Sequence, residues 1–155
     1  MKPVHNFINI SGRRQKQRGA VLVEFAFILP FLTLLILGIV DLGLLIRNSQ
    51  IIQNAARETA RYSSLPKNWL DPRNPSASVT DIAQRAVDYC AEENLTISLS
   101  DVTVDQSETI VVGGVTIRLS EIIVTMNHNF ITPGAGLIFG DPVPITGRAL
   151  FRNLF

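Results

Sequence analysis

Glu24 in this 155-residue chain is an acid within an apolar stretch, where a charged side chain is costly. Between Arg18 and Arg47 only Glu24 and Asp41 are charged, and residues 25–40 carry no charge at all. Insertion scales put a charged acid at the centre of a bilayer at a cost of about 2.5–3.5 kcal/mol, and less near an interface. An acid in this position therefore needs a function or a partner of opposite charge.

The stretch that contains Glu24 is long enough to cross a membrane. Residues 20–46 would span roughly 40 Å as a helix, whereas about 20 residues suffice for a bilayer. A buried core helix is usually shorter and carries a polar face. A secretory signal peptide has a shorter apolar region and a small-residue cleavage site, which the sequence RNSQI after Ile46 does not supply. We therefore predict a transmembrane helix over residues 20–46.

The basic residues predict the orientation of this helix. Five of them precede it, with no acid among residues 1–18, and only Arg47 follows in the next nine residues. Because cytoplasmic flanks carry the excess of Lys and Arg, residues 1–19 are predicted to be a basic cytoplasmic leader. Residues 47–155 are predicted to form one domain on the other side of the membrane, in the periplasm.

The sequence contains no recognisable motif for catalysis or metal binding. It contains no phosphate-binding loop, no nucleophile elbow, no zinc-protease motif and no C-x-x-C pair. Cys90 is the single cysteine, and His5 and His128 lie in unrelated contexts. Residues 19–155 are mildly acidic, which disfavours a nucleic-acid-binding body. We expect a protein that is not an enzyme and takes no metal, cofactor, nucleic acid or small-molecule substrate.

The residues around Gly19 resemble a type IV prepilin cleavage site. A basic leader ends at Gly19, four apolar residues follow from Ala20, and Glu24 precedes the aromatic Phe25. The resemblance implies that a membrane prepilin peptidase cuts after Gly19 on the cytoplasmic face. It also implies that Glu24 becomes the fifth residue of the mature chain and pairs with the new α-amino group, on Ala20, of a neighbouring subunit.

Within that class the sequence resembles the TadE-like family, the pseudopilins of tight-adherence (Flp) pilus systems. The similarity covers about residues 18–62 and rests on RGAxxVEFA at 18–26, Leu29-Pro30, Gly38 and AAREx-AR at 55–61. Asp41 stands where many relatives have Glu. The chain length fits the minor, TadE or TadF type better than the short major pilins or the longer TadG-like proteins.

The resemblance implies a minor pilin in the bacterial inner membrane that takes part in assembly of an Flp pilus and is itself incorporated in the extracellular fibre or held at its base. Its implied partners are the prepilin peptidase, other pilin or pseudopilin subunits, the inner-membrane assembly platform and the lipid bilayer. The alternative is a single-pass membrane-anchored periplasmic binding or envelope protein that never enters a fibre. Glu24 separates the two, because an ordinary anchor gains nothing from an acid at that depth.

The first helix is predicted to continue beyond the membrane, over about residues 20–64. Pro30 lacks the amide hydrogen for one helical hydrogen bond and is expected to kink the helix. Ala56 and Ala60 form a pair of small residues that either packs within its own domain or lets a neighbouring helix approach. Arg57 and Arg61, one turn apart, are expected to be solvated at the surface; the alternative is that they pair with an acid elsewhere in the domain or on a neighbouring subunit.

The rest of the chain predicts a small α+β domain of pilin-like plan. A Pro-containing loop over residues 65–78 leads to a second short helix, capped by Ser78 or Thr80 and ending near residue 94. Cys90 lies on its apolar stripe and is expected to be a buried thiol. Alternating residues then predict an antiparallel sheet, with strands at 96–99, 101–105, 109–112, 115–126 and 145–151 and a hairpin turn at Gly113-Gly114. Asp41 is expected to be a solvated acid near the outer membrane interface.

Overall fold

The structure of the chain is a computed structural model that describes residues 11–71, 77–140 and 142–154, without the side chains of residues 11–18 and 138. The chain divides into two compact units, Met1–Val40 and Asp41–Phe155. Most of the predicted leader, residues 1–10, lies outside the described residues. The same holds for Pro72 and Pro75 of the predicted loop.

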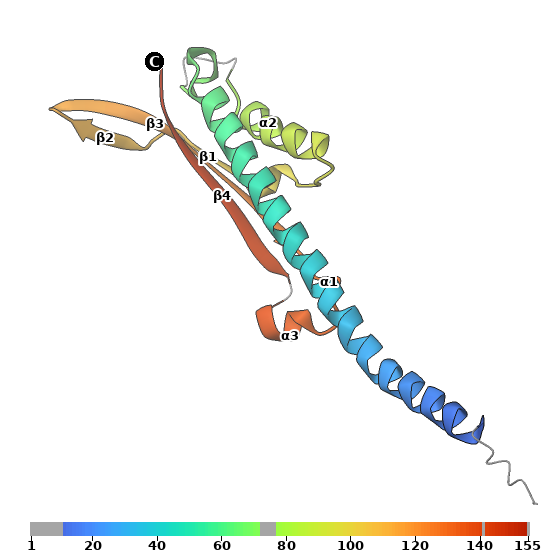
Figure 1. The fold of residues 1–155 in the computed structure, drawn as a ribbon. Coiled ribbons are helices and arrows are strands. Elements are labelled where there is room, and N and C mark those ends of the chain that lie inside the picture. Colours follow the sequence, from blue (N-terminus) through green and yellow to red (C-terminus); the bar gives the residue numbers. More distant parts are fainter. Residues whose placement is uncertain (1–10, 72–76, 141, 155) are drawn as a thin grey trace, which may run out of the picture. The chain divides into compact units, whose positions relative to one another are not determined.

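Helix α1 (Ser11–Ser63) contributes to both units and carries the predicted membrane segment (Figure 1). It begins nine residues before the predicted start at 20 and ends one residue before the predicted end. Its part from Gly19 onward is long and apolar enough to cross a membrane, as predicted. Almost every large apolar side chain from Val21 to Val40 is exposed, which fits a helix surrounded by lipid. Pro30 lies inside this helix, and the kink there stays a prediction.

One long strand organises the antiparallel sheet of the second unit. Strand β3 (Val115–His128) pairs through its first residues with β2 (Thr109–Val112). Its second half pairs with both β1 (Val102–Asp105) and β4 (Val143–Arg152). Gly113 and Gly114 form the predicted two-residue turn, each with a positive φ that suits glycine.

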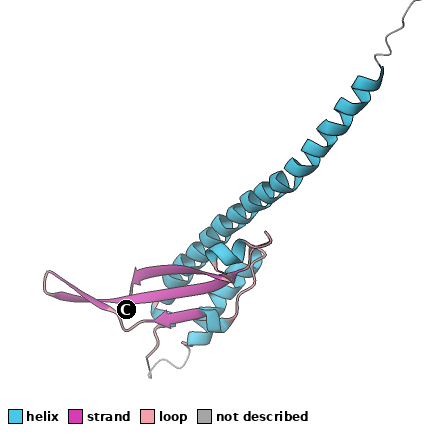
Figure 2. Cartoon of the chain, turned by 90° about the horizontal axis from the view of Figure 1, so that it is seen from below, coloured by secondary structure: helices cyan, strands magenta, loops and turns pink. Residues whose placement is uncertain are grey.

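The helices of this unit pack on one face of the sheet and make its core (Figure 2). Helix α2 (Val79–Glu92) begins where the Ser78 hydroxyl accepts a hydrogen bond from the Thr80 amide, so Ser78 is the cap. The fully buried side chains come from α1, α2 and β3 and include Ile52, Ile82, Ile122 and Val124. The α+β plan of a long helix, a short helix and a small antiparallel sheet is therefore confirmed.

The first predicted strand is wrong. Residues 96–98 have no regular structure, and residues 99–101 form a 3-10 turn, although Ile97 is buried as the alternation suggested. The Asp101 carboxylate accepts hydrogen bonds from the amide and the hydroxyl of Ser98, at 2.8 and 2.7 Å. This capping box takes up the backbone donor that a strand would offer to a neighbour. Between β3 and β4 the chain forms a short helix, α3 (Ala135–Phe139).

The buried thiol of Cys90 gives a test of this core. Cys90 is fully buried, as predicted, and burial raises the pKa of its thiol to about 11. We expect native protein at pH 8 to resist iodoacetamide, because the thiol is neutral and inaccessible there, and to react once unfolded. A Cys90→Ala/Ala91→Cys variant moves the thiol to the next, exposed position and should react at once. Equal labelling rates of the two native proteins would contradict the described core.

Gly147 lets β4 approach the backbone of α1. A Cβ atom at Gly147 would lie 2.6 Å from the carbonyl oxygen of Ile52. Beside this contact the Gln53 side-chain amide donates to the Arg148 carbonyl at 2.8 Å and accepts from the Arg148 amide at 3.3 Å. The helix thus provides hydrogen bonds for the otherwise open edge of β4, and only glycine leaves room for it.

Gly147→Ala is therefore expected to lower the free energy of unfolding by about 1–3 kcal/mol, the usual cost of overpacking. Thermal unfolding of the purified full chain in detergent, followed by circular dichroism, measures the effect. Gly43→Ala is the matched control, because nothing lies within 4 Å of a Cβ atom there. Equal melting temperatures for the two variants would contradict the close contact.

Candidate processing and assembly site

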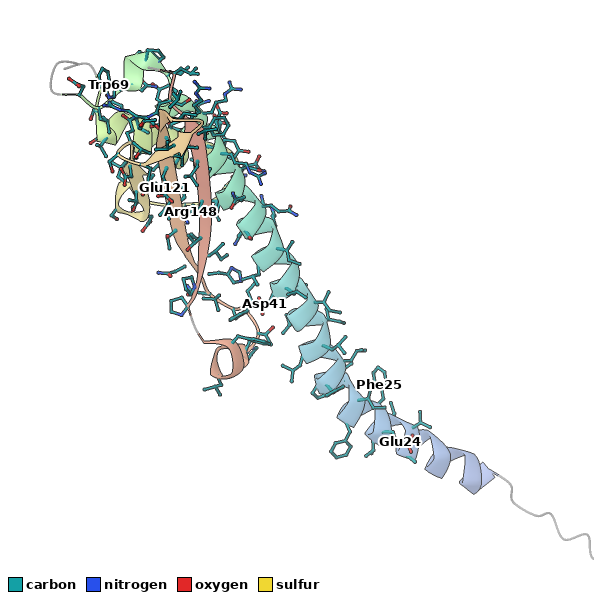
Figure 3. All side chains as sticks on the ribbon, turned by 90° about the vertical axis from the view of Figure 1, so that its left-hand side faces the viewer. Glu24, Phe25, Asp41, Trp69, Glu121 and Arg148 are labelled. Carbon is teal, nitrogen blue, oxygen red and sulfur yellow. The ribbon has the colours of Figure 1, made fainter. Side chains whose placement is uncertain are left out.

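The residues of the predicted cleavage site lie on one continuous stretch of α1. Gly19 and Ala20 are exposed, and nothing lies within 4 Å of a Cβ atom at Gly19. Glu24 lies four positions after Ala20, so both lie on one face of the helix, about 6 Å apart along its axis. Phe25 is 58% exposed beside Glu24 (Figure 3). No described residue outside this helix therefore covers Gly19.

Glu24 has no partner within the described residues. Its side chain is exposed, and no hydrogen bond or ion pair joins it to a described residue. The large residues on either side, Val21, Leu22, Val23, Phe25 and Phe27, are all apolar and all exposed. On a helix that is long and apolar enough to cross a membrane, a carboxylate without a described partner is costly.

Asp41, the second acid of the apolar region, is not the solvated group expected from sequence. It is only 2% exposed, and its two carboxylate oxygens accept hydrogen bonds from the amides of Ile131 and Thr132, at 2.9 and 2.7 Å. Figure 3 shows it facing the segment that follows β3. About two turns further along α1, the side-chain amide of Asn48 lies 3.3 Å from the ring of His128, which is buried. Asp41 thus ties the segment after β3 to α1.

The four residues predicted for packing or partner contact divide into two pairs. Ala56 and Ala60 are fully buried in the core of their own domain, which supports the first of the two interpretations of this pair. Arg57 and Arg61 are exposed. Arg61 lies 3.8 Å from Glu58, and Glu58 also pairs with Arg85 of α2 at 3.3 Å. Exposed pairs of this kind contribute little to stability, so the arginines remain available to a partner.

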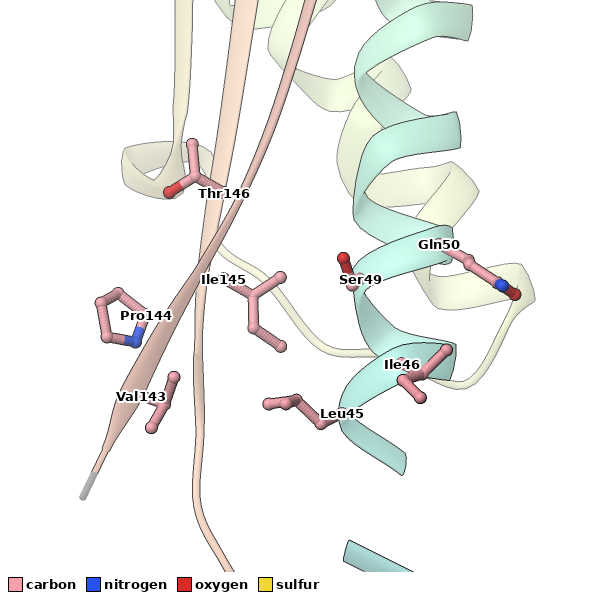
Figure 4. A pocket seen from close by; sticks show the side chains of 8 residues that line it. All are labelled: Leu45, Ile46, Ser49, Gln50, Val143, Pro144, Ile145 and Thr146. Carbon is pink, nitrogen blue, oxygen red and sulfur yellow. The ribbon is translucent and has the colours of Figure 1, made fainter. Parts of the chain in front are cut away.

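An open groove of about 430 Å³ runs between α1 and the start of β4 (Figure 4). Its lining is mostly apolar and consists of Leu45, Ile46, Ser49, Gln50, Val143, Pro144, Ile145 and Thr146. It lacks the charged or titratable side chains that would orient a polar ligand. Among the described residues there is also no cluster of three potential metal ligands.

Comparison with known families gives one result, and it concerns α1. Residues 19–61 match the model of the family described as TadE-like protein. Over this segment the chain is similar to the TadE-like family. No curated protein and no solved structure matches the chain.

The TadE-like match begins at Gly19 and ends at Arg61. It therefore covers the apolar segment and its continuation into the domain, and it contains none of the sheet. The match associates this segment with Tad pilus systems, and the same segment is long and apolar enough to cross a membrane. The features of the site that lie in the match are Glu24, Asp41 and the arginines, while Gly147 and the segment bound by Asp41 lie outside it.

Sequence reasoning missed two of these features. The role of Asp41 depends on two amides ninety residues away, so no local pattern could reveal it. Its position directly after an uncharged run of sixteen residues was the available signal, because a charged group there needs hydrogen bonds. The sequence around Gly147 did not indicate the close approach of α1, since a single glycine in a strand is compatible with several structural roles.

Proposed function

We propose that this TadE-like chain is a minor pilin or pseudopilin of a tight-adherence (Flp) pilus, cleaved by a prepilin peptidase after Gly19. The observation that carries the proposal is Glu24, an exposed acid without a described partner, five residues after Gly19 on an exposed apolar helix. Cleavage removes the basic leader and creates a positive charge on Ala20. The α-amino group of Ala20 in a neighbouring subunit then supplies the positive charge that pairs with Glu24.

The pairing acts between subunits. Within one chain Ala20 and Glu24 are fixed by the same helix, but a neighbour displaced along the fibre axis can bring its amine to this carboxylate. Each charge alone in lipid costs several kcal/mol, and a close pair removes much of that cost. Packing two helices in the wrong register would leave both charges unpaired, so the pair also selects the stagger between subunits.

The remaining parts of the proposal follow from this role. The N-terminus lies in the cytoplasm, where the peptidase and the assembly platform meet it, and residues 47–155 lie in the periplasm. The protein is a structural subunit rather than an enzyme, and its partners are other pilins, the platform and the bilayer. The alternative, an anchored periplasmic binding protein, would use the groove or the sheet and would leave Glu24 without a role.

Variants at Gly19 test the processing step. Gly19→Phe should block cleavage, because a large side chain at the cut obstructs the peptidase, whereas Gly19→Ala should slow it only partly. Gly38→Phe is the control, since it adds the same side chain to an equally exposed glycine of α1. Intact masses of the proteins from cells that make the whole pilus system report the outcome. Normal processing of Gly19→Phe, or failure of Gly38→Phe alone, would contradict the assigned site.

A further inference from the structure

The segment after β3 exposes an apolar surface that the domain itself does not cover. Residues 130–140 read FITPGAGLIFG and contain no charge. Within it, Leu137 is 93% exposed, Phe139 68% and Ile131 59%. The Phe130 and Phe139 rings lie 5.9 Å apart, so the segment folds over itself while its outer side stays bare. An exposed apolar cluster of this kind marks a contact surface.

Asp41 holds this segment at one position along the axis of α1. Its carboxylate binds the amides of Ile131 and Thr132, so the segment lies beside the residue that ends the uncharged run. Asp41 comes twenty-one residues after Ala20, a rise of about 31 Å in a helix, and the hydrocarbon core of a bilayer is about 30 Å thick. With the start of the span at one interface, Asp41 and the segment it holds reach the other.

Five backbone amides of the segment donate hydrogen bonds to acceptors within the described residues. The Ile131 and Thr132 amides donate to Asp41 rather than to solvent. Three further amides donate within the segment, from Ala135 to the Thr132 carbonyl, from Leu137 to Gly134, and from Gly140 to Gly136, at 2.9–3.2 Å. Backbone donors with such partners can enter the edge of the hydrocarbon without the cost of an unpaired polar group.

Apolar side chains of α1 that follow Asp41 are exposed as well. Leu42 is 57% exposed and Ile46 52%, and Ile46 also lines the groove against Val143 and Pro144. These side chains and those of the segment belong to the same compact unit. A lipid surface is the occupant that covers both at once, because the chain already enters it at this point.

We propose that residues 131–139 are a second membrane contact, seated at the boundary of headgroups and acyl chains in the leaflet nearest the domain. Leu137 and Phe139 insert, while Asp41 holds the segment against α1. Interfacial segments of this kind typically bury their apolar side about 5–10 Å into that boundary. The proposal depends on the membrane span and is independent of cleavage and of the pilus.

A probe at residue 137 tests the contact in the full chain. Leu137→Cys in a Cys90→Ala background is labelled with the fluorophore NBD and placed, one copy per disc, in nanodiscs of phosphatidylethanolamine and phosphatidylglycerol. The matched control is Val111→Cys, a 69% exposed apolar residue of β2, which pairs with the opposite end of β3 from the segment. Phe139→Cys is a second probe position in case labelling at 137 perturbs the segment.

The expected result is that the probe at 137 emits at shorter wavelength than the probe at 111 and resists aqueous dithionite. Lipids with a spin label near the headgroup should lower its emission about twofold, with little effect at 111, because only an interfacial probe comes this close to them. Dithionite reduction at equal rates at 137, 139 and 111 would overturn the proposal. Protection from dithionite without quenching by spin-labelled lipid would assign the surface to protein and overturn it as well.

Discussion

Glu24→Gln is expected to be cleaved after Gly19 and yet to fail in pilus assembly. The amide keeps the shape of the side chain but removes the charge that attracts the Ala20 amine of a neighbour. That ammonium would then be buried beside a neutral partner, which costs several kcal/mol for each subunit contact. Pilus production, or crosslinking of the subunit to partner pilins, should fall at least tenfold while the processed mass remains that of the cleaved chain.

The matched control for this prediction is Glu92→Gln. Glu92 is an exposed acid at the end of α2, outside the apolar region, so the same change of charge there should leave assembly unaffected. Normal pili from a processed Glu24→Gln subunit would reduce Glu24 to a headgroup contact. Loss of cleavage in Glu24→Gln would assign the residue to recognition by the peptidase instead.

Asp41→Ala is expected to release the segment after β3 from α1. The variant removes both acceptors of the Ile131 and Thr132 amides, and hydrogen bonds to a charged acceptor are among the stronger ones in proteins. Hydrogen–deuterium exchange of these two amides should accelerate by about tenfold or more, since their protection rests on this one side chain. Amides of β3 that pair with β4 should keep their rates, because their partners are unchanged.

Asp88→Ala provides the comparison for Asp41→Ala. Asp88 is an exposed acid on α2 whose only described contact is with the Gln84 side chain at 2.7 Å. It should leave exchange at Ile131 and Thr132 unchanged. Unaltered exchange in Asp41→Ala would show that the segment is held by other contacts, and uniformly faster exchange would indicate loss of the whole fold.

The parts of the fold that were predictable from sequence rest on short-range rules. The apolar run of α1, the stripe of α2 and the glycine pair at 113 and 114 each determine local structure through residues near in sequence. The strand expected at 96–99 is wrong because of another short-range contact. Ile97 is buried as the alternation predicts, but Leu99 is exposed, and the carboxylate of Asp101 accepts the Ser98 amide that a strand would offer to a neighbour.

The parts that were not predictable depend on contacts between distant residues. The sequence predicts that Asp41 is an acid near a membrane surface, but only the fold shows that residues 131 and 132 supply its donors. A pair of small residues suits both packing within the domain and contact with a neighbouring helix. Only the positions of the sheet and α2 show that Ala56 and Ala60 pack within their own domain. Glu24 differs, because its significance comes from the absence of anything polar near it in the sequence.

The N-terminal residue of the protein isolated from membranes of cells that make the whole pilus system is the most direct test of the proposed function. Edman sequencing and intact mass together should show a chain of 136 residues, the 155 of the full sequence without residues 1–19, beginning Ala-Val-Leu-Val-Glu-Phe. The same chain from cells without the prepilin peptidase should keep all residues through Gly19. A mature protein that retains residues 1–19 in cells with the peptidase would contradict the assignment as a processed pilin or pseudopilin.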